Sequence, residues 1–409
     1  MTQHNEVGAV PHDQPRADRL VRTLAMVVFL EWVAGGAFLP LFPVYLHHQG
    51  ASSTVVGLVI GAFFLAGLVG QYPAGKLIDR IGARNVLLGG QLLYALSIGS
   101  FLLFSSPLAA VLLRFTQGLG AGAAEVASLS IVAIVVAPER RGRAFATIYG
   151  AQLSGTIVGP ILGAAFGVTH MNWLFATTTL LTLSSSIPVL LRPELHSLHT
   201  NRDLGATLSR LKLSDAAKGS LLLAVAFGLV IGTYDASWSL LLREKGAGDL
   251  AINLSWICFS APFVLASRPA GWMADHFDRR LLALIGVGVE AALCSLYPFL
   301  THVWIMLALA TIEAFALAAA LPAGQSLLTV GAANDSHGRL QGLYATCQMG
   351  AMTVAAVTGG LLFGRAAWLP FVAMAGASVI VGLAIAHRWR KVDGKVSHAG
   401  ATQTSTLES

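Results

Sequence analysis

Charged residues are scarce in this sequence, since Asp, Glu, Lys and Arg make up only 11% of its 409 residues. A soluble globular protein contains about 25% charged residues and about 45–50% apolar ones. Here 55% of the residues are hydrophobic. The composition therefore excludes a water-soluble fold and indicates a chain that lies almost entirely within a membrane.

Cysteine is also rare, and its three residues lie far apart at Cys258, Cys294 and Cys347. They form no Cys-x-x-Cys pair, so the sequence gives no sign of a disulfide framework or a zinc site. The His47–His48 pair and His170 lack the spacing of metal ligands. We therefore expect no metal and no cofactor.

Nucleotide and nucleic-acid binding are not expected either. The segment from Gly70 to Lys76 imitates a phosphate-binding loop, but Leu77 occupies the position that requires Ser or Thr, and no strand precedes it. The net charge of +6 is explained by the positions of the basic residues in loops, described below.

Long apolar runs are abundant. Hydropathy predicts a retained first helix and twelve transmembrane helices in all. Their ranges are 22–46, 54–74, 85–105, 107–136, 144–168, 172–191, 219–242, 250–273, 281–300, 303–329, 339–363 and 366–387.

Nearly all of the 26 lysines and arginines lie in the tails or in alternate connections between these helices. The opposite connections contain only Arg243, Lys245 and Arg365, and Arg114 lies inside a helix. Because basic loops stay on the cytoplasmic side, both termini are expected there. The short loops favour the inner (plasma) membrane of a bacterium.

The expected domain organisation follows from the same pattern. A cytoplasmic tail (1–21) precedes an N-terminal six-helix bundle (22–192), and a polar cytoplasmic connector (193–217) leads to a C-terminal six-helix bundle (218–388). A second cytoplasmic tail covers 389–409.

The two bundles repeat each other in sequence. One constant offset aligns two distant regions of the first half with the second: Pro73 with Pro269, Gly75 with Gly271, Asp79 with Asp275, Arg84 with Arg280, Gln152 with Gln348 and Gly163 with Gly359. A parallel duplication of six helices is typical of transporters that bind substrate near the membrane midplane, between the halves.

The loop after the second helix resembles the corresponding loop of the major facilitator superfamily through Gly75, Asp79, Arg80, Gly82 and Arg84. A weaker second copy of that loop contains Gly271, Asp275 and Arg280, with Asp278 in place of the second loop glycine. The resemblance implies a twelve-helix major facilitator fold of two pseudo-symmetric bundles and a latching role for Asp79. Basic residues that only fix orientation are the alternative.

Two further segments carry the resemblance. The segment Arg114 to Gly120 is similar to the fourth-helix motif of the superfamily. Residues Gly155, Gly159, Pro160 and Gly163 are similar to the fifth-helix motif of its proton-coupled exporters, with Ala164 where that motif often has Gly. This implies export. Simple helix packing through small residues is the alternative reading.

Ionisable residues in hydrocarbon are costly and mark transport sites by default. Six lie within predicted helices: Glu31, Arg114, Glu125, Asp235, Glu290 and Glu313. By resemblance, helices 1, 4, 7 and 10 line the central cavity, so every one except Glu290 faces the transport path. Gln117 and Gln152 complete the candidate set.

Arg114 and Glu125 share one helix face but lie roughly 16 Å apart at 1.5 Å per residue, too far for an ion pair. Glu31 is the expected partner for each. A carboxylate in an apolar cavity holds a proton that a nearby cation can expel, which is the physical basis of proton exchange. A purely structural polar network is the alternative.

The sequence thus predicts a secondary active transporter, a monomer in the lipid bilayer, that exports small, partly apolar molecules such as drugs or metabolites in exchange for protons. A proton-coupled importer of a sugar, organic acid or other metabolite is the first alternative, and a non-transporting membrane sensor the second. No nucleophile with a base is found, so an enzyme is not expected.

Overall fold

The computed structural model describes residues 14–104, 106–137, 140–192, 194, 213–330 and 337–392. Within these ranges the chain is helical, with no strand. Eleven helices are long and apolar enough to cross a membrane, and a bent pair of shorter helices makes a twelfth span. The expected all-α membrane fold is confirmed.

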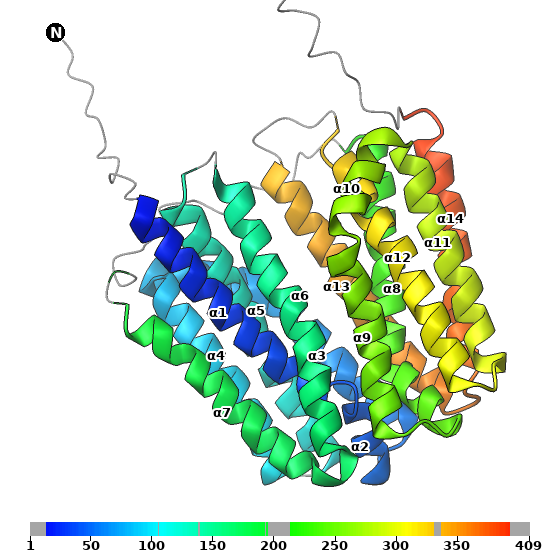
Figure 1. Ribbon diagram of the computed structural model, residues 1–409, viewed down its shortest axis with the longest axis horizontal. Helices are drawn as coiled ribbons and strands as arrows, with labels where there is room; N and C mark the ends of the chain where they lie inside the picture. Colours follow the sequence, from blue (N-terminus) through cyan, green and yellow to red (C-terminus); the bar gives the residue numbers. More distant parts are fainter. Residues whose placement is uncertain are drawn as a thin grey trace, which may run out of the picture.

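Figure 1 shows these helices as two neighbouring bundles, one for each half of the chain. The N-terminal half contains α1 (Gln14–Phe38), α2 (Phe42–His48), α3 (Ser53–Ile81), α4 (Ala83–Gly99), α5 (Pro107–Val135), α6 (Arg141–Phe166) and α7 (Met171–Leu190). The C-terminal half contains α8 (Asp215–Glu244), α9 (Asp249–Leu265), α10 (Ser267–His276), α11 (Arg279–Leu296), α12 (Val303–Leu327), α13 (His337–Phe363) and α14 (Leu369–Trp389).

Two expected helices are broken, each near proline. The helix expected at 22–46 ends at Phe38 and resumes as α2, with Pro40 between the pieces and Pro43 in the first turn of α2. The expected single helix at 250–273 bends by 58° between α9 and α10, at Pro269. Proline removes a backbone donor and crowds the preceding turn, so a helix is interrupted there. Hydropathy does not detect this interruption and therefore predicts one continuous helix in each case.

Several helices extend beyond their apolar cores. α1 begins at Gln14, inside the expected tail, and α8 begins at Asp215, inside the expected connector. Ser214 caps α8 by accepting a hydrogen bond from the Ala217 amide at 3.1 Å, a signal that hydropathy does not read. Residues 1–13, most of the connector (195–212) and 393–409 lie outside the described residues.

The two ends of the bundle are distinguished by their helices. We call the end where α1 begins and α14 ends the terminal end, and the other the α2 end. Aromatic side chains fill the core toward the α2 end: Phe38, Phe42, Phe101 and Phe175 in the N-terminal half, and Tyr234, Trp238, Phe259, Tyr297 and Phe371 in the C-terminal half.

Glycine allows the halves to approach closely. A Cβ atom added at Gly57 of α3 would lie 2.8 Å from the Cα atom of Gly360 in α13, and one at Gly61 would lie 2.7 Å from Val357. Such distances leave no room for a side chain. The backbones of α3 and α13 therefore touch near the α2 end.

Candidate functional site

Arg114 is the most buried cation of the described membrane helices, with 3% of its surface exposed. Its Nη1 atom donates to Oε1 of Gln117 at 2.7 Å. The guanidinium lies 4.4 Å from the ring centroid of Phe63 and 5.4 Å from that of Phe42. Its Nε atom has no hydrogen-bond partner. Ring faces and one amide thus replace the water that the charge has lost.

Asp235 of α8, in the C-terminal half, is the carboxyl that interacts with Arg114 of the N-terminal half. Asp235 is 8% exposed and interacts electrostatically with Arg114. No ion pair within 4.0 Å joins the two in the described part of the chain. A charge of each sign, one from each half, therefore faces the other without direct contact.

Glu31 lies in α1 with its side chain partly exposed. Its carboxyl interacts electrostatically with Glu125 of α5 and with the Tyr94 phenol of α4. A Cβ atom at Gly35, one turn after Glu31, would lie 2.9 Å from the Tyr94 hydroxyl. The glycine thus leaves the space that this hydroxyl occupies.

The expected ion pair between Glu31 and Arg114 is not present among the described residues. Tyr94 interacts with both groups, and the guanidinium is turned toward Gln117 and the phenylalanine rings. The Phe38 and Phe42 rings pack beside Arg114 because α1 breaks at Pro40. Tyr94 therefore interacts with both the acid and the base that sequence analysis paired directly.

The candidate side chains of α5 are more buried toward the α2 end. Glu125 is exposed, and Gln152 on the neighbouring α6 is partly exposed. Gln117 is 0% exposed and Arg114 nearly so. The solvent exposure of the candidate side chains in this half thus decreases from Glu125 and Gln152 to Gln117 and Arg114.

Glu313 lies inside the C-terminal half, with hydrogen-bond partners that, among the described residues, come only from that half. Its Oε1 atom accepts a hydrogen bond from Tyr234 at 2.9 Å and its Oε2 atom accepts one from Tyr297 at 2.6 Å. Both partners belong to the C-terminal half, and Glu313 is 0% exposed. Glu290 of α11, which sequence analysis placed outside the cavity, is likewise 0% exposed and near Glu313.

The matching loops of the two halves make the same kind of local contact. Arg84 donates to the carbonyl oxygens of Val189 at 3.3 Å and Leu190 at 3.2 Å, at the end of α7. Arg280 donates to the carbonyl oxygens of Trp389 at 3.2 Å and Val392, at the end of α14. Each arginine thus bonds to the C-terminal end of the last helix of its own half.

The other loop residues lie around these two arginines. Gly82 has φ +85° between α3 and α4, where a side chain would be strained. Asp79 is partly exposed, Arg80 is exposed and Gly75 is buried in α3. In the second copy, Asp275 lies 3.8 Å from Arg279, and a Cβ atom at Gly271 would meet nothing within 4 Å.

The glycine series of α6 packs directly on α1. A Cβ atom at Gly159 would lie 2.7 Å from the carbonyl carbon of Gly36, and one at Gly155 would lie 2.9 Å from the Phe29 oxygen. Gly163 sits where α1, α6 and α9 meet, 2.7 Å from Oδ1 of Asn253 by the same measure. Pro160 is buried within the continuous α6.

Asp249, which sequence analysis did not single out, joins the halves at the α2 end. Its Oδ2 atom accepts a hydrogen bond from the Val168 amide at 2.7 Å, and its Oδ1 atom accepts one from Arg243. Gly167, with φ +68°, lets the chain turn so that this amide faces α9. α6 and α9 converge toward this end (Figure 1).

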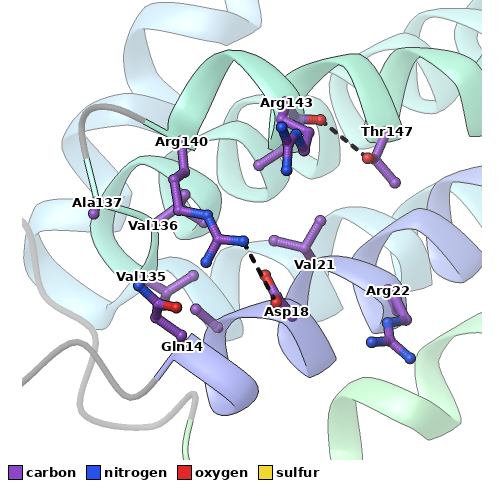
Figure 2. A pocket seen from close by; sticks show the side chains of 12 residues that line it. Gln14, Asp18, Val21, Arg22, Val135, Val136, Ala137, Arg140, Arg143 and Thr147 are labelled. Atoms are coloured by element: carbon purple, nitrogen blue, oxygen red, sulfur yellow. Dashed lines mark hydrogen bonds and ion pairs between the residues drawn. The ribbon is translucent and has the colours of Figure 1, made fainter.

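A hollow of about 280 Å³ lies at the terminal end between α1, α5 and α6. Figure 2 shows Arg140 reaching toward Asp18 across it, 3.9 Å apart, with Arg22 and Arg143 on its walls. None of the candidate transport residues lines it. The hollow is therefore separate from the site around Arg114.

Sequence analysis missed Tyr94, Tyr234, Tyr297 and Asp249. A weak signal existed for the tyrosines, because each interrupts an apolar run with a polar hydroxyl. Asp249 reads from sequence as an ordinary residue of a loop and first turn. Its role depends on Val168, which is distant along the chain, so no local pattern reveals it.

No group of three or more His, Cys, Asp or Glu residues that could hold a metal ion occurs in the described ranges. The chemistry that these residues supply is the binding and release of protons by carboxyl groups beside a fixed cation, with phenols and amides as hydrogen-bond donors.

Comparison with known proteins agrees with this architecture. The uncharacterized MFS-type transporter YcaD of Escherichia coli O45:K1 (strain S88) is 28% identical over 252 residues, 61% of this chain. The match spans 65% of that relative's length, less than two thirds.

Solved structures share the fold at low identity. A POT family transporter in complex with 5-aminolevulinic acid matches 90% of this chain and 95% of its own, with a TM-score of 0.76 and 13% identity. The nucleoside transporter NupG matches 90% of this chain and 100% of its own, with a TM-score of 0.72 and 14% identity.

The model of the Major Facilitator Superfamily matches residues 24–236 and 220–407. These matches cover both halves and agree with the expectation of a transporter rather than an enzyme. The chain belongs to the Major Facilitator Superfamily.

Proposed function

We propose that this transporter works by alternating access and exports small, partly apolar molecules in exchange for protons. The observation that carries the proposal is the set of charges linked to Arg114: Asp235 of the C-terminal half interacts with it, and Tyr94 interacts both with Arg114 and with Glu31, which in turn interacts with Glu125. A buried cation between carboxyl groups is suited to exchange protons against a substrate.

In this proposal Glu31 is the main proton carrier. It is partly exposed and close to a second carboxyl, so an arriving cationic group or a movement of Arg114 changes which of the two carries a proton. Tyr94 interacts electrostatically with both Glu31 and Arg114. In this proposal it transmits a change in the protonation of Glu31 to Arg114, or a movement of Arg114 to Glu31.

Alternating access requires two ends that open in turn. The bond between Asp249 and Val168 and the contact of Gly57 with Gly360 hold the halves together at the α2 end. We place this end outside the cell and both termini in the cytoplasm, because basic residues gather in the terminal-end loops. The membrane is then the bacterial inner membrane, and the chain acts as a monomer.

The exporter assignment rests on the glycine series of α6. Gly155 and Gly159 press against α1, the helix that contains Glu31, so a shift of α6 moves the proton-carrying helix directly. The gating role of Asp79, Arg80 and the second-half loop is part of the same proposal, with Arg84 and Arg280 anchoring each loop to its own half.

A proton-coupled importer is the second candidate. The solved structures of similar fold include a nucleoside transporter and a POT family transporter in complex with 5-aminolevulinic acid, which suggests metabolites as substrates to test. A sensor with this fold would bind such compounds without moving them.

The direction of coupling is tested in vesicles that contain the purified protein in one known orientation. Tetraphenylphosphonium, uridine and 5-aminolevulinic acid serve as cationic, neutral and zwitterionic probes. Export predicts that acidifying the side facing the α2 end drives a probe toward that side. Movement in the opposite direction supports the importer, and binding without movement supports the sensor.

A further inference from the structure

Two carboxyl groups are fully buried in the core of the C-terminal half, on the packed helices α11 and α12. Glu290 lies in α11 and Glu313 in α12, both are 0% exposed, and they interact electrostatically. No lysine or arginine forms an ion pair with either one in the part of the chain that the structure describes. The pair therefore has no counter-charge.

Hydrogen bonds reach the two carboxyls unequally. Glu313 accepts bonds from two phenols, at 2.9 Å from Tyr234 and 2.6 Å from Tyr297. Glu290 accepts one bond, from Ser378 of α14 at 3.1 Å, and its Oε2 atom has no partner.

The remaining titratable group against the pair is the Cys294 thiol, which donates to the Phe371 carbonyl at 3.5 Å. Together with the two tyrosines, it completes the set of titratable neighbours from α8, α11 and the turn after α11.

Two adjacent carboxylates cannot both stay charged in dry surroundings without a cation, because desolvation and mutual repulsion act in the same direction. Glu313, with two phenol donors, is the better place for one negative charge. The unpartnered oxygen of Glu290 is the position left for a proton. The pair thus suits one shared proton.

We propose that Glu290 and Glu313 form a second proton-binding site of the transporter, in which the two carboxyls share one proton in the conformation described here. This inference rests on the proposed proton coupling, but it concerns different residues from Glu31 and can fail separately.

α8 connects this site to the first one. Tyr234 of α8 donates to Glu313, and the next residue, Asp235, interacts with Arg114 of the other half. A movement of α8 that removes the Tyr234 donor leaves the Glu313 carboxylate less stable, so the pair takes up a further proton from water. The return of Tyr234 releases that proton to water.

Infrared spectroscopy of the purified full chain in lipid nanodiscs tests the shared proton. A carboxylic acid in dry surroundings gives a C=O stretching band that carboxylates lack. We expect the double variant Glu290→Gln with Glu313→Gln to lose part of this band at neutral pH. The Ser378→Ala variant removes the hydrogen bond to Glu290. We expect it to shift the frequency of the same component of the C=O band.

Glu244→Gln, which changes an exposed carboxylate at the end of α8, is the matched control and leaves the band unchanged. If the double variant fails to fold, Glu290→Gln alone provides the comparison. A band that the carboxyl substitutions leave unaltered would overturn the proposal.

A second readout separates a proton site from a structural cluster. In vesicles, Tyr234→Phe and Glu290→Gln are expected to lower the number of protons moved per substrate while transport itself persists. An unchanged ratio in both variants would also overturn the proposal. The band lost in Glu31→Gln is measured separately and is expected to add to the band lost in the double variant, so failure of the first proton site is recognised independently.

Discussion

The carboxylate of Asp249 accepts a hydrogen bond from the Val168 amide at 2.7 Å and so joins α9 of one half to the turn before α7 of the other. Arg243 holds the second oxygen of the same carboxylate. One side chain thus ties the two halves at the α2 end, where a transporter of this architecture must open in its other conformation.

Asp249→Ala is expected to shift the protein toward the conformation open at the α2 end. A hydrogen bond to a charged group contributes about 1.5–3 kcal/mol, which corresponds to roughly a tenfold or larger change in population. Spin labels at Asn172 and Leu250, both exposed beside the contact, report the distance between the halves after the native cysteines are replaced.

The matched control for that distance measurement is Glu244→Gln, an exposed carboxylate at the same end. If Asp249→Ala and the unmodified protein give the same distance distribution, the bond between Asp249 and Val168 does not hold the halves together.

Gly159→Ala is expected to destabilise the N-terminal half by about 1–3 kcal/mol, the usual effect of overpacking. The added Cβ atom would press on Gly36 of α1. Gly150→Ala, on the same helix but with no atom within 4 Å of the added carbon, is the control and should be neutral or stabilising. Thermal unfolding in detergent compares the two, and equal melting temperatures would contradict the packing argument.

Asp278 gives a pH-dependent prediction outside the membrane. The Arg280 side chain beside it lowers the pKa of this carboxyl below its ordinary value. A lowered pKa in the folded protein contributes stability above the ordinary pKa, and that contribution is lost as the pH falls through the folded value. Asp278→Asn keeps the helix cap, because Asn caps as well as Asp, but loses the charge.

We therefore expect Asp278→Asn to lower the melting temperature at neutral pH, and to approach the unmodified protein only as the pH falls well below about 4, the ordinary pKa of Asp. Asp278→Ala also loses the bond to the Arg280 amide, which costs about 0.5–2 kcal/mol more. A difference between the Asn variant and the unmodified protein that does not depend on pH would contradict the role of the charge.

Arg114→Lys is expected to reduce transport by at least about tenfold, since a lysine ammonium lacks the planar fork that bonds Gln117 and stacks on Phe63. The transported probe identified in vesicles provides the measurement. Arg143→Lys, at an exposed position of α6, is the control. Full activity in Arg114→Lys would mean that only the positive charge matters.

The fold was accessible from sequence because its signals are long and repeated. Twelve apolar runs and the alternation of basic loops are properties of whole segments, and the alignment of Arg84 with Arg280 is matched by equivalent bonds at the ends of α7 and α14. Breaks at Pro40 and Pro269 were missed since hydropathy averages over such positions.

The candidate site was accessible only in part. Charges in hydrocarbon are rare, so Glu31, Arg114 and Asp235 stand out in the sequence. Their partners do not: Arg114 bonds Gln117 and packs on phenylalanine rings, and Glu313 bonds Tyr234 and Tyr297. Such pairings depend on how helices rotate against each other, which no single helix encodes.

In the proposed mechanism Glu31 exchanges protons against substrate, and proton release from vesicles measures that exchange. Purified protein is reconstituted with a pH-sensitive dye, and tetraphenylphosphonium, uridine and 5-aminolevulinic acid are added in turn to the unmodified protein, to Glu31→Gln and to Glu244→Gln. We expect substrate-triggered proton movement that Glu31→Gln abolishes and Glu244→Gln retains. Proton movement that persists in Glu31→Gln would contradict it.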